Sequence, residues 1–253
     1  MKKTAIITGA TGGLGNEFVK SICENKELDE IWAVGRNSEK LGILAGNDAR
    51  IVAIEADLTD NGTEIIRQLL SEINPDVRML INNAGTAYMG PFDDMDPVQV
   101  EKICRLNCSV PSVLMSYALP YMHEGAKIIN ISSASSFQPN PYLAMYSASK
   151  AYLKNLSRAV GAELKKRGIT VTCVCPGWID TEMLPRERDG KVIRYPGMIS
   201  AGAVVGKALR DSARGRSMSV PGAFAKYFRL YSKLTPTDIV MKQWMMIMKK
   251  YVS

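Results

Sequence analysis

Histidine is nearly absent from this sequence, and its scarcity excludes two common kinds of catalytic centre. His123 is the only histidine among the 253 residues. Neither a zinc site built from several histidines nor a Ser-His-Asp triad is therefore expected. We predict a site without a bound metal.

Cysteine is also scarce, and its spacing argues against disulfides and metal ligation. The five cysteines are an odd number, and no two of them form a C-x-x-C pair. Cys173 and Cys175 alternate along an apolar strand-like run, while Cys104 and Cys108 share one face of a helical pattern. We predict that all five are packing residues.

Long hydrophobic runs are missing as well. The opening MKKTAIIT resembles the start of a secretory signal, but its apolar run ends at Gly9. No other stretch approaches the roughly 18 apolar residues that a membrane span needs. With 46% hydrophobic and 23% charged residues, the composition is typical of a soluble globular protein, and we expect a cytoplasmic one.

Positive charge is concentrated at the C-terminal end. The formal net charge is +7, and residues 221–253 contribute +5 of it, through six Lys or Arg residues against Asp238. A basic protein can bind nucleic acid, but no motif for such binding accompanies this charge. We therefore predict no nucleic-acid partner.

Apolar runs and turn signals alternate regularly along the chain. Strands that are apolar on both faces and separated by helices favour a parallel sheet covered on each side. We predict an α/β fold of Rossmann type, a doubly wound parallel sheet of about seven strands flanked by helices on both faces, in one domain spanning 1–253. Ligands then bind at the carboxyl ends of the strands. The predicted strands are 4–8, 31–34, 51–56, 79–82, 126–132, 169–175 and the weaker 217–220; the predicted helices lie near 13–26, 38–45, 62–73, 96–122 and 142–167.

A glycine-rich loop follows the first strand. Gly9, Gly13 and Gly15 have the spacing G-x-x-x-G-x-G between a strand and a helix. Glycines there allow a tight turn and a close approach of the backbone to a pyrophosphate, whose charge a helix N-terminus stabilises. A mononucleotide P-loop is disfavoured because no Lys-Ser/Thr ending follows, and a plain tight turn is the remaining alternative.

The end of the second strand indicates which dinucleotide binds. A site for NAD usually has Asp or Glu here for the ribose 2′-hydroxyl, whereas a 2′-phosphate needs a cation and no carboxylate. Gly35 occupies the acidic position and Arg36 follows it. We predict NADP(H) in preference to NAD(H); the alternative is that Arg36 only caps a loop or pairs at the surface.

Two further segments follow strands at the same edge of the predicted sheet. Asp57 and Leu58 follow the third strand and are placed to approach the adenine ring. The stretch NNAG follows the fourth strand, and its small residues let the chain pass close to a cofactor. We predict cofactor contacts from Asn83, Ala84 and Gly85.

Taken together, these stretches resemble the short-chain dehydrogenase/reductase family. The matching stretches run in the family's order from Thr8 to Thr181 and are TGATGGLG, NNAG, RLN, NISS, YSASK and PGWIDT. The resemblance implies that Thr8 and Leu14 bind the cofactor together with the loop glycines. It also implies that Thr181 meets the nicotinamide carboxamide, and that Pro176 and Gly177 turn the chain toward it.

The same resemblance implies a catalytic set. Ser133, thirteen residues before Tyr146, corresponds to the family's catalytic serine, and Asn107 to the asparagine that holds a water in a proton relay. A homodimer or homotetramer, formed through the long helices after Asn107 and Tyr146, is implied as well.

Tyr146 and Lys150 stand four residues apart, which places them on one face of a helix. An ammonium group beside a phenol favours the phenolate and lowers its pKa from the ordinary value near 10. We predict Tyr146 as the acid/base, Lys150 as its tuner and as a ligand of the cofactor ribose, and Ser133 as the ligand of the substrate oxygen.

Two segments are expected to form the rest of the pocket wall, and the C-terminal extension follows them in the chain. Residues 137–144 and the polar substrate loop 183–199 are predicted walls, the second long enough to be a lid. In the C-terminal helical extension, residues 221–253, an apolar stripe runs along one helix face. Packing on the domain or on another subunit is the favoured interpretation, and a methionine-rich lid or a basic helix lying on an anionic membrane are the alternatives. The stripe residues are Met241, Trp244, Met245 and Met248.

The leading functional prediction is an NADP(H)-dependent oxidoreductase that interconverts a carbonyl and a secondary alcohol of a small-molecule substrate by hydride transfer. Enzymatic alternatives are a 3-oxoacyl-[acyl-carrier-protein] reductase and a hydroxysteroid or fatty-carbonyl dehydrogenase. A non-enzymatic alternative is a cofactor-sensing protein that keeps the fold without the chemistry. Such a protein typically loses Tyr or Lys, and this chain has Asn107, Ser133, Tyr146 and Lys150 together.

Overall fold

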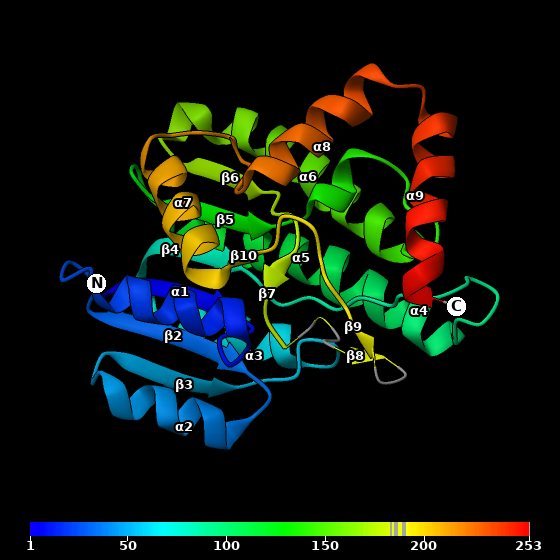
Figure 1. Cartoon of the computed structure of the whole chain (residues 1–253). Coiled ribbons are helices and arrows are strands. Elements are labelled where there is room, and N and C mark those ends of the chain that lie inside the picture. The colour runs from blue at the N-terminus through cyan, green and yellow to red at the C-terminus, as the bar shows by residue number, and fades with distance from the viewer. Residues whose placement is uncertain (183, 185–186, 189–190, 253) are drawn as a thin grey trace.

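The centre of the molecule is a parallel sheet (Figure 1). The computed structural model describes residues 1–182, 184, 187–188 and 191–252. Within this part of the chain the sheet has seven strands in the order β11-β6-β5-β4-β1-β2-β3. The predicted doubly wound α/β fold is confirmed. The strands are β1 (Lys3–Thr8), β2 (Glu30–Gly35), β3 (Ile51–Glu55), β4 (Asp76–Asn82), β5 (Lys127–Ile131), β6 (Thr170–Val174) and β11 (Met218–Ser219).

Burial along the strands follows their place in the sheet. Ala5, Ile6 and Ile7 of β1 are fully buried, because this central strand is covered on both faces. The edge strand β3 is instead partly exposed, with Ile51 and Ile54 buried and the two residues between them exposed. Apolar residues are therefore buried throughout the central strand, whereas those of the edge strand are buried only in part.

Helices cover both faces of the sheet. One core, on the side of Ala5 and Ile7, is filled by α1, α2 and α7, and the other, on the side of Ile6, is filled by α3, α5 and α6. Figure 1 shows α1 and α7 side by side in front of the sheet. The helices are α1 (Gly13–Cys23), α2 (Ser38–Asn47), α3 (Gly62–Ile73), α4 (Pro97–Cys104), α5 (Val110–Ala118), α6 (Ala144–Leu164), α7 (Ala201–Ala213), α8 (Ala223–Leu234) and α9 (Thr237–Val252).

The helix predicted over 96–122 is interrupted. After α4 the chain makes a wider π-helical turn, η1 (Arg105–Ser109), before α5, and it ends in a 3-10 turn, η2 (Leu119–Tyr121). Pro111 gives a reason: it has no N–H for the carbonyl of Asn107, and its ring would clash with that carbonyl in a regular helix. The wider turn, closed by the Val110 N–H on the Arg105 carbonyl, relieves this conflict.

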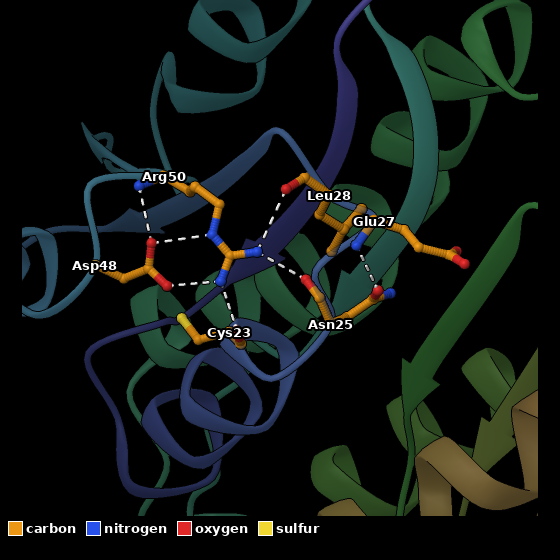
Figure 2. Close-up of polar contacts among 6 residues, drawn as sticks. All are labelled: Cys23, Asn25, Glu27, Leu28, Asp48 and Arg50. Atoms are coloured by element: carbon orange, nitrogen blue, oxygen red, sulfur yellow. Dashed lines mark hydrogen bonds and ion pairs between the residues drawn. The ribbon is translucent and has the colours of Figure 1, made fainter.

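Helix α1 ends at Cys23, three residues earlier than predicted. The side chain of Arg50 binds the chain at this helix end. Figure 2 shows its guanidinium group among the carbonyls of Cys23, Asn25 and Leu28, with the Asp48 carboxylate on its other side. These contacts hold the pKa of Asp48 well below its usual range. They also satisfy carbonyls that a helix end leaves without partners. This clamp fixes the end of α1 that lies away from the glycine loop.

The cysteine prediction is wrong for one residue. Cys173 and Cys175 are fully buried and pack between β6 and its neighbours, as expected. Cys104 is exposed, because it lies on the outer side of α4. No packing role follows for Cys104.

Short strands surround the predicted substrate loop. β7 (Ile179–Asp180) pairs in parallel with β10 (Ile199–Ser200), and β8 (Glu187–Arg188) pairs with β9 (Lys191–Val192) as an antiparallel hairpin. Residues 183, 185–186 and 189–190 of the predicted loop 183–199 lie outside the described residues. The pairing of β7 with β10 holds the two ends of the loop together.

Candidate active site

A cavity of about 750 Å³ lies where the strands of the sheet end. Segments that follow β1, β2, β3, β4, β5 and β6 all contribute to its lining. This is the place where a doubly wound sheet binds ligands, and the volume lies within the usual range of about 300–1,000 Å³ for a ligand site.

The glycine loop forms one wall with its backbone. Gly9 has φ +64°, and a Cβ on Gly15 would stand 2.0 Å from the Gly9 carbonyl oxygen, so neither position accommodates a side chain. Gly12 caps α1 without a side-chain hydrogen bond, and the first turn of α1 has no acidic residue. The backbone N–H groups there suit a diphosphate, and the predicted Gly13 and Leu14 line the cavity beside them. These residues fit a dinucleotide.

Thr8 lies behind this wall. Its side chain is buried, and its hydroxyl donates to the Ile81 carbonyl while accepting from the N–H groups of Asn83 and Ala84. The Asn83 amide returns a hydrogen bond to the Thr8 carbonyl at 3.0 Å. Thr8 therefore joins the glycine loop to NNAG, and it does not line the cavity, whereas Asn83, Ala84 and Gly85 do.

Arg36 and Asp57 face each other across the end of the cavity formed by β2 and β3. An Arg36 nitrogen lies 3.8 Å from an Asp57 carboxylate oxygen; the Arg36 side chain is largely exposed and that of Asp57 is partly exposed. Thr59 holds this carboxylate through its N–H and hydroxyl groups, which lowers the pKa of Asp57. A Cβ on Gly35 would lie 3.2 Å from the Thr11 hydroxyl, so the acidic position is also sterically tight. Leu58 is buried and lines the same region.

Tyr146 and Ser133 line the cavity from α6 and from the turn after β5. Burial raises the pKa of the Tyr146 phenol, and a hydrogen bond with Ser133 lowers it by less, so the net direction is upward. The Ser133 hydroxyl also accepts the Ser135 N–H at 3.1 Å, which fixes its position. The phenol is therefore protonated at neutral pH in the protein alone.

Lys150 is buried one turn beyond Tyr146. Its ammonium nitrogen donates to the Ile131 carbonyl at 2.8 Å and lies 5.7 Å from the centre of the Tyr146 ring. Desolvation lowers the pKa of Lys150 from 10.5 to about 8. The predicted lowering of the phenol's pKa by this ammonium is not present in the protein alone, because burial has the larger effect on both groups.

Asn107 lies in the π-helical turn and does not line the cavity. Its amide donates to the Thr86 carbonyl and to the Ser149 hydroxyl, and its oxygen accepts the Thr86 N–H. Ser149 in turn donates to the Tyr146 carbonyl at 2.8 Å. The side chain of Asn107 therefore ties the segment after NNAG to the first turns of α6.

The predicted cofactor residues after β6 line the side of the cavity next to the glycine loop. Thr181 lies over Gly13, since a Cβ there would meet its methyl carbon at 3.1 Å. The Pro176 carbonyl accepts the Ala134 N–H at 2.7 Å, and Gly177 packs against Phe224 of α8. All three predicted residues, Pro176, Gly177 and Thr181, line the cavity.

Sequence reasoning missed an aromatic wall. Trp178 stacks with Trp244 of α9 at 6.4 Å between ring centres, and Phe228 of α8 lies 5.9 Å from Trp244. Trp178 directly follows Pro176 and Gly177, and Trp244 belongs to the predicted apolar stripe. The sequence therefore drew attention to both residues, but it did not show that they line the same cavity. The other missed lining residues include Thr11, Thr59, Thr86, Met89, Leu106 and Phe224.

The predictions for residues 137–144 and for the C-terminal stripe are each wrong in part. Most of residues 137–144 line a second hollow of about 510 Å³ beside Met241, and within this stretch Leu143 lines the main cavity. In α9 the inner face consists of Val240, Met241, Trp244 and Met248, whereas Met245 is partly exposed. Met241, Trp244 and Met248 of the predicted stripe therefore pack inward as expected, whereas Met245 does not, and Val240 packs inward in its place.

Comparisons with known proteins find a matching family model and several relatives. The family model described as short chain dehydrogenase matches residues 3–191. A Homo sapiens protein named inactive hydroxysteroid dehydrogenase-like protein 1 is 35% identical over 190 residues, which cover 71% of this chain and 56% of that protein. A very-long-chain 3-oxoacyl-CoA reductase of Anas platyrhynchos is 31% identical over 193 residues, covering 71% and 60%. The chain thus matches little more than half the length of these relatives.

A solved structure is similar over most of its length. A short-chain dehydrogenase from Sphingobium yanoikuyae in complex with NADPH has a TM-score of 0.78 and 27% identity, covering 90% of this chain and 92% of that one. The match to the family model ends at residue 191, before α8 and α9. The aromatic wall from these two helices therefore lies outside the matched region.

Proposed function

Because the chain belongs to the short chain dehydrogenase family, we propose that it is an NADP(H)-dependent oxidoreductase that interconverts a carbonyl and a secondary alcohol, with Tyr146 as acid/base. One observation carries the proposal: Tyr146, Ser133 and Lys150 line the same cavity as the glycine loop and Arg36. A chain without this chemistry would not need a protonated phenol and a buried ammonium at a dinucleotide cavity.

The proton side of the reaction follows from these residues. Reduced nicotinamide, when bound, supplies a hydride. Tyr146, whose raised pKa keeps the phenol protonated at neutral pH, donates a proton to the substrate oxygen. The Ser133 hydroxyl hydrogen-bonds that oxygen and stabilises the charge that develops on it.

Lys150 and Asn107 support the proton donor. Among the described residues the Lys150 ammonium has one acceptor, the Ile131 carbonyl, so two N–H groups remain for ribose hydroxyls and for the phenolate. The Asn107 amide hydrogens are both in use, so the predicted relay water binds its backbone carbonyl, to which Pro111, four residues on, has no N–H to donate. A proton path from Tyr146 to solvent can pass through this water.

The pocket favours a large apolar substrate. Trp178, Phe228 and Trp244 form an aromatic wall, and the described lining carries few charged groups near Tyr146. Hydroxysteroid and fatty-carbonyl substrates suit this wall. The names of the two relatives, a hydroxysteroid dehydrogenase-like protein and a 3-oxoacyl-CoA reductase, refer to the same substrate classes. A 3-oxoacyl-[acyl-carrier-protein] reductase remains an alternative. The predicted cytoplasmic location and dimer or tetramer remain predictions.

The test is a screen of ketones, aldehydes, steroids and acyl thioesters, with NADPH absorbance as the readout. With the best substrate, Tyr146→Phe is expected to lower kcat by roughly 10²–10⁴-fold, because it removes the transferred proton. Tyr152→Phe is a matched control, since Tyr152 lies on the outer side of the same helix and bonds Ser112. Normal turnover by Tyr146→Phe would contradict the assignment. NADPH binding without turnover of any substrate would favour the cofactor-sensing alternative.

Cofactor preference has its own test. Arg36→Leu is expected to raise KM for NADPH by about 10–100-fold and to leave KM for NADH nearly unchanged, because a charge-assisted hydrogen bond to the 2′-phosphate is lost. Arg67→Leu, which removes an exposed arginine paired with Glu64 on α3, is the control. An equal loss with both cofactors would show that Arg36 does not distinguish them.

A further inference from the structure

Helix α8 is apolar on its inner side and on part of its outer side. Inward, Phe224 and Phe228 line the cavity. Outward, Tyr227, Leu230 and Leu234 have exposed fractions of 63%, 58% and 73%. These three follow one another at helical spacing and form a continuous stripe.

Helix α9 extends this stripe. Ile239 and Met246 are exposed on it, at 47% and 67%. Gln243, which lies between them along the helix, contacts the Tyr231 hydroxyl of α8, so these sides of the two helices adjoin. Figure 1 shows α8 and α9 at the outer edge of the molecule, joined by a short turn. We call the set Tyr227, Leu230, Leu234, Ile239 and Met246 the outer hairpin face.

Basic residues flank the outer hairpin face. On α8, Lys226, Arg229 and Lys233 are exposed and lie along one side of the stripe, and Lys242 is exposed on α9. Asp238 is the one acidic residue in 221–253, which has six Lys or Arg residues and a net charge of +5 out of +7 for the chain. Apolar side chains beside a row of cations complement a surface that is anionic outside and apolar beneath.

We propose that the outer hairpin face docks on an anionic lipid bilayer, with its apolar residues inserted below the headgroups and its cations on the phosphates. Within the described residues no helix is long and apolar enough to span a membrane, so the hairpin lies on the bilayer rather than crossing it. A second copy is a poorer occupant, because a twofold contact would bring the basic rows of both copies together. An acidic protein would match the cations but would not require the exposed leucines.

This docking has a consequence for the cavity. The inner side of α8 lines it, so the bilayer surface and the cavity would be separated by about one helix diameter, roughly 10 Å. An apolar carbonyl dissolved in the bilayer would then have a short path to Tyr146. That consequence rests on the proposed function, whereas the docking itself does not.

The experiment uses the full chain and vesicle flotation. Vesicles of phosphatidylcholine alone are compared with vesicles of equal parts phosphatidylcholine and phosphatidylglycerol. The wild type is expected to bind the anionic vesicles at least about tenfold more tightly, and about 0.5 M salt should weaken the binding. Leu230→Gln with Leu234→Gln, and separately Lys226→Gln with Lys233→Gln, should each reduce the binding about tenfold or more.

Matched controls change the same residue types elsewhere. Ile43→Gln with Val98→Gln alters exposed apolar residues of α2 and α4, and Lys165→Gln with Lys166→Gln alters exposed lysines after α6. These variants should bind as the wild type does. Melting temperature and turnover of a water-soluble ketone, where one is found, report that each variant is folded.

Three results would overturn the proposal. The first is that the wild type fails to bind anionic vesicles. The second is that the leucine variant binds as well as the wild type, because contact through charge alone does not use the outer hairpin face. The third is that the leucine variant lowers the molecular mass measured by sedimentation equilibrium while the wild type ignores vesicles, because the face would then join two copies.

Discussion

The hydroxyl of Ser133 contacts the same phenol that the reaction uses. Its hydrogen bond lowers the pKa of Tyr146, against the larger upward effect of burial. The oxidation of an alcohol needs the phenolate, so its rate rises with pH through the pKa of Tyr146, whereas carbonyl reduction needs the phenol and falls there. Ser133 therefore helps to set the pH range in which the enzyme catalyses alcohol oxidation and the range in which it catalyses carbonyl reduction.

Replacing Ser133 tests this coupling. In Ser133→Ala the rising limb of kcat/KM for alcohol oxidation should move to higher pH, because the effect that lowers the phenol's pKa is gone. The value of kcat should fall by about 10²–10³-fold, because a donor to the substrate oxygen is lost. Ser135→Ala is the matched control, because the backbone N–H of residue 135 still donates its hydrogen bond to the Ser133 hydroxyl. A limb that stays in place or moves to lower pH would contradict the coupling.

The identities of the site residues could be predicted from the sequence, but their electrostatics could not. Gly9, Gly15, Tyr146 and Lys150 stand at positions that backbone geometry and helical spacing define locally. Desolvation depends on what the rest of the fold places around a group. That is why the spacing of Tyr146 and Lys150 predicted a lowered phenol pKa and the folded protein has a raised one.

At the scale of elements, one proline shapes the middle of the molecule. Pro111 follows Asn107 by four residues, and the π-helical turn separates α4 from α5 at this point. The turn directs the Asn107 amide to Thr86 and Ser149. The sequence predicted a regular helix over the whole segment and did not predict these contacts. A single wide turn shifts the apolar pattern by only one residue, so the pattern did not reveal the interruption, although Pro111 inside the predicted helix was a sequence signal for it.

Helix α9 makes a specific contribution to the pocket through Trp244. Its indole is buried, packs on Trp178 and Phe228, and donates to the Pro141 carbonyl at 2.9 Å. Trp244→Ala should raise KM about tenfold or more for a large apolar ketone and little for a small one, because only the large substrate reaches the wall. The expected loss of stability, about 3–5 kcal/mol, is checked by melting temperature, and Trp244→Phe separates it from the loss of contact.

The matched control for Trp244 lies on the other side of the same helix. Met246→Ala removes an exposed side chain from α9 and should change neither KM. An equal change in KM for the large and the small ketone in Trp244→Ala would mean that the large substrate does not contact the aromatic wall. Within this helix the sequence prediction was wrong for Met245, which is partly exposed, and it omitted the buried Val240. Methionines occur on both of its sides, so the apolar pattern alone did not define which side packs inward.

The folded molecule as a whole carries a buried charge that its stability must offset. Lys150 is buried, and its pKa is lowered from 10.5 to about 8, so the unfolded chain binds more protons than the folded one between those values. Stability rises with pH wherever the unfolded state binds more protons. For this group the free energy of unfolding therefore increases from about pH 8 to pH 10.5, and the full cost of the buried ammonium is present below pH 8.

Lys150→Met should accordingly stabilise the cofactor-free protein while abolishing its activity. At pH 7 the change removes the desolvation cost of the ammonium and leaves the Ile131 carbonyl unpaired, for a net gain of roughly 1–2 kcal/mol. The melting temperature should rise by a few degrees, and the difference from the wild type should shrink as the pH increases from 8 to 10.5. Lys165→Met, at an exposed position directly after α6, should show neither effect. A variant less stable than the wild type throughout this pH range would mean that the Ile131 contact outweighs the desolvation of Lys150.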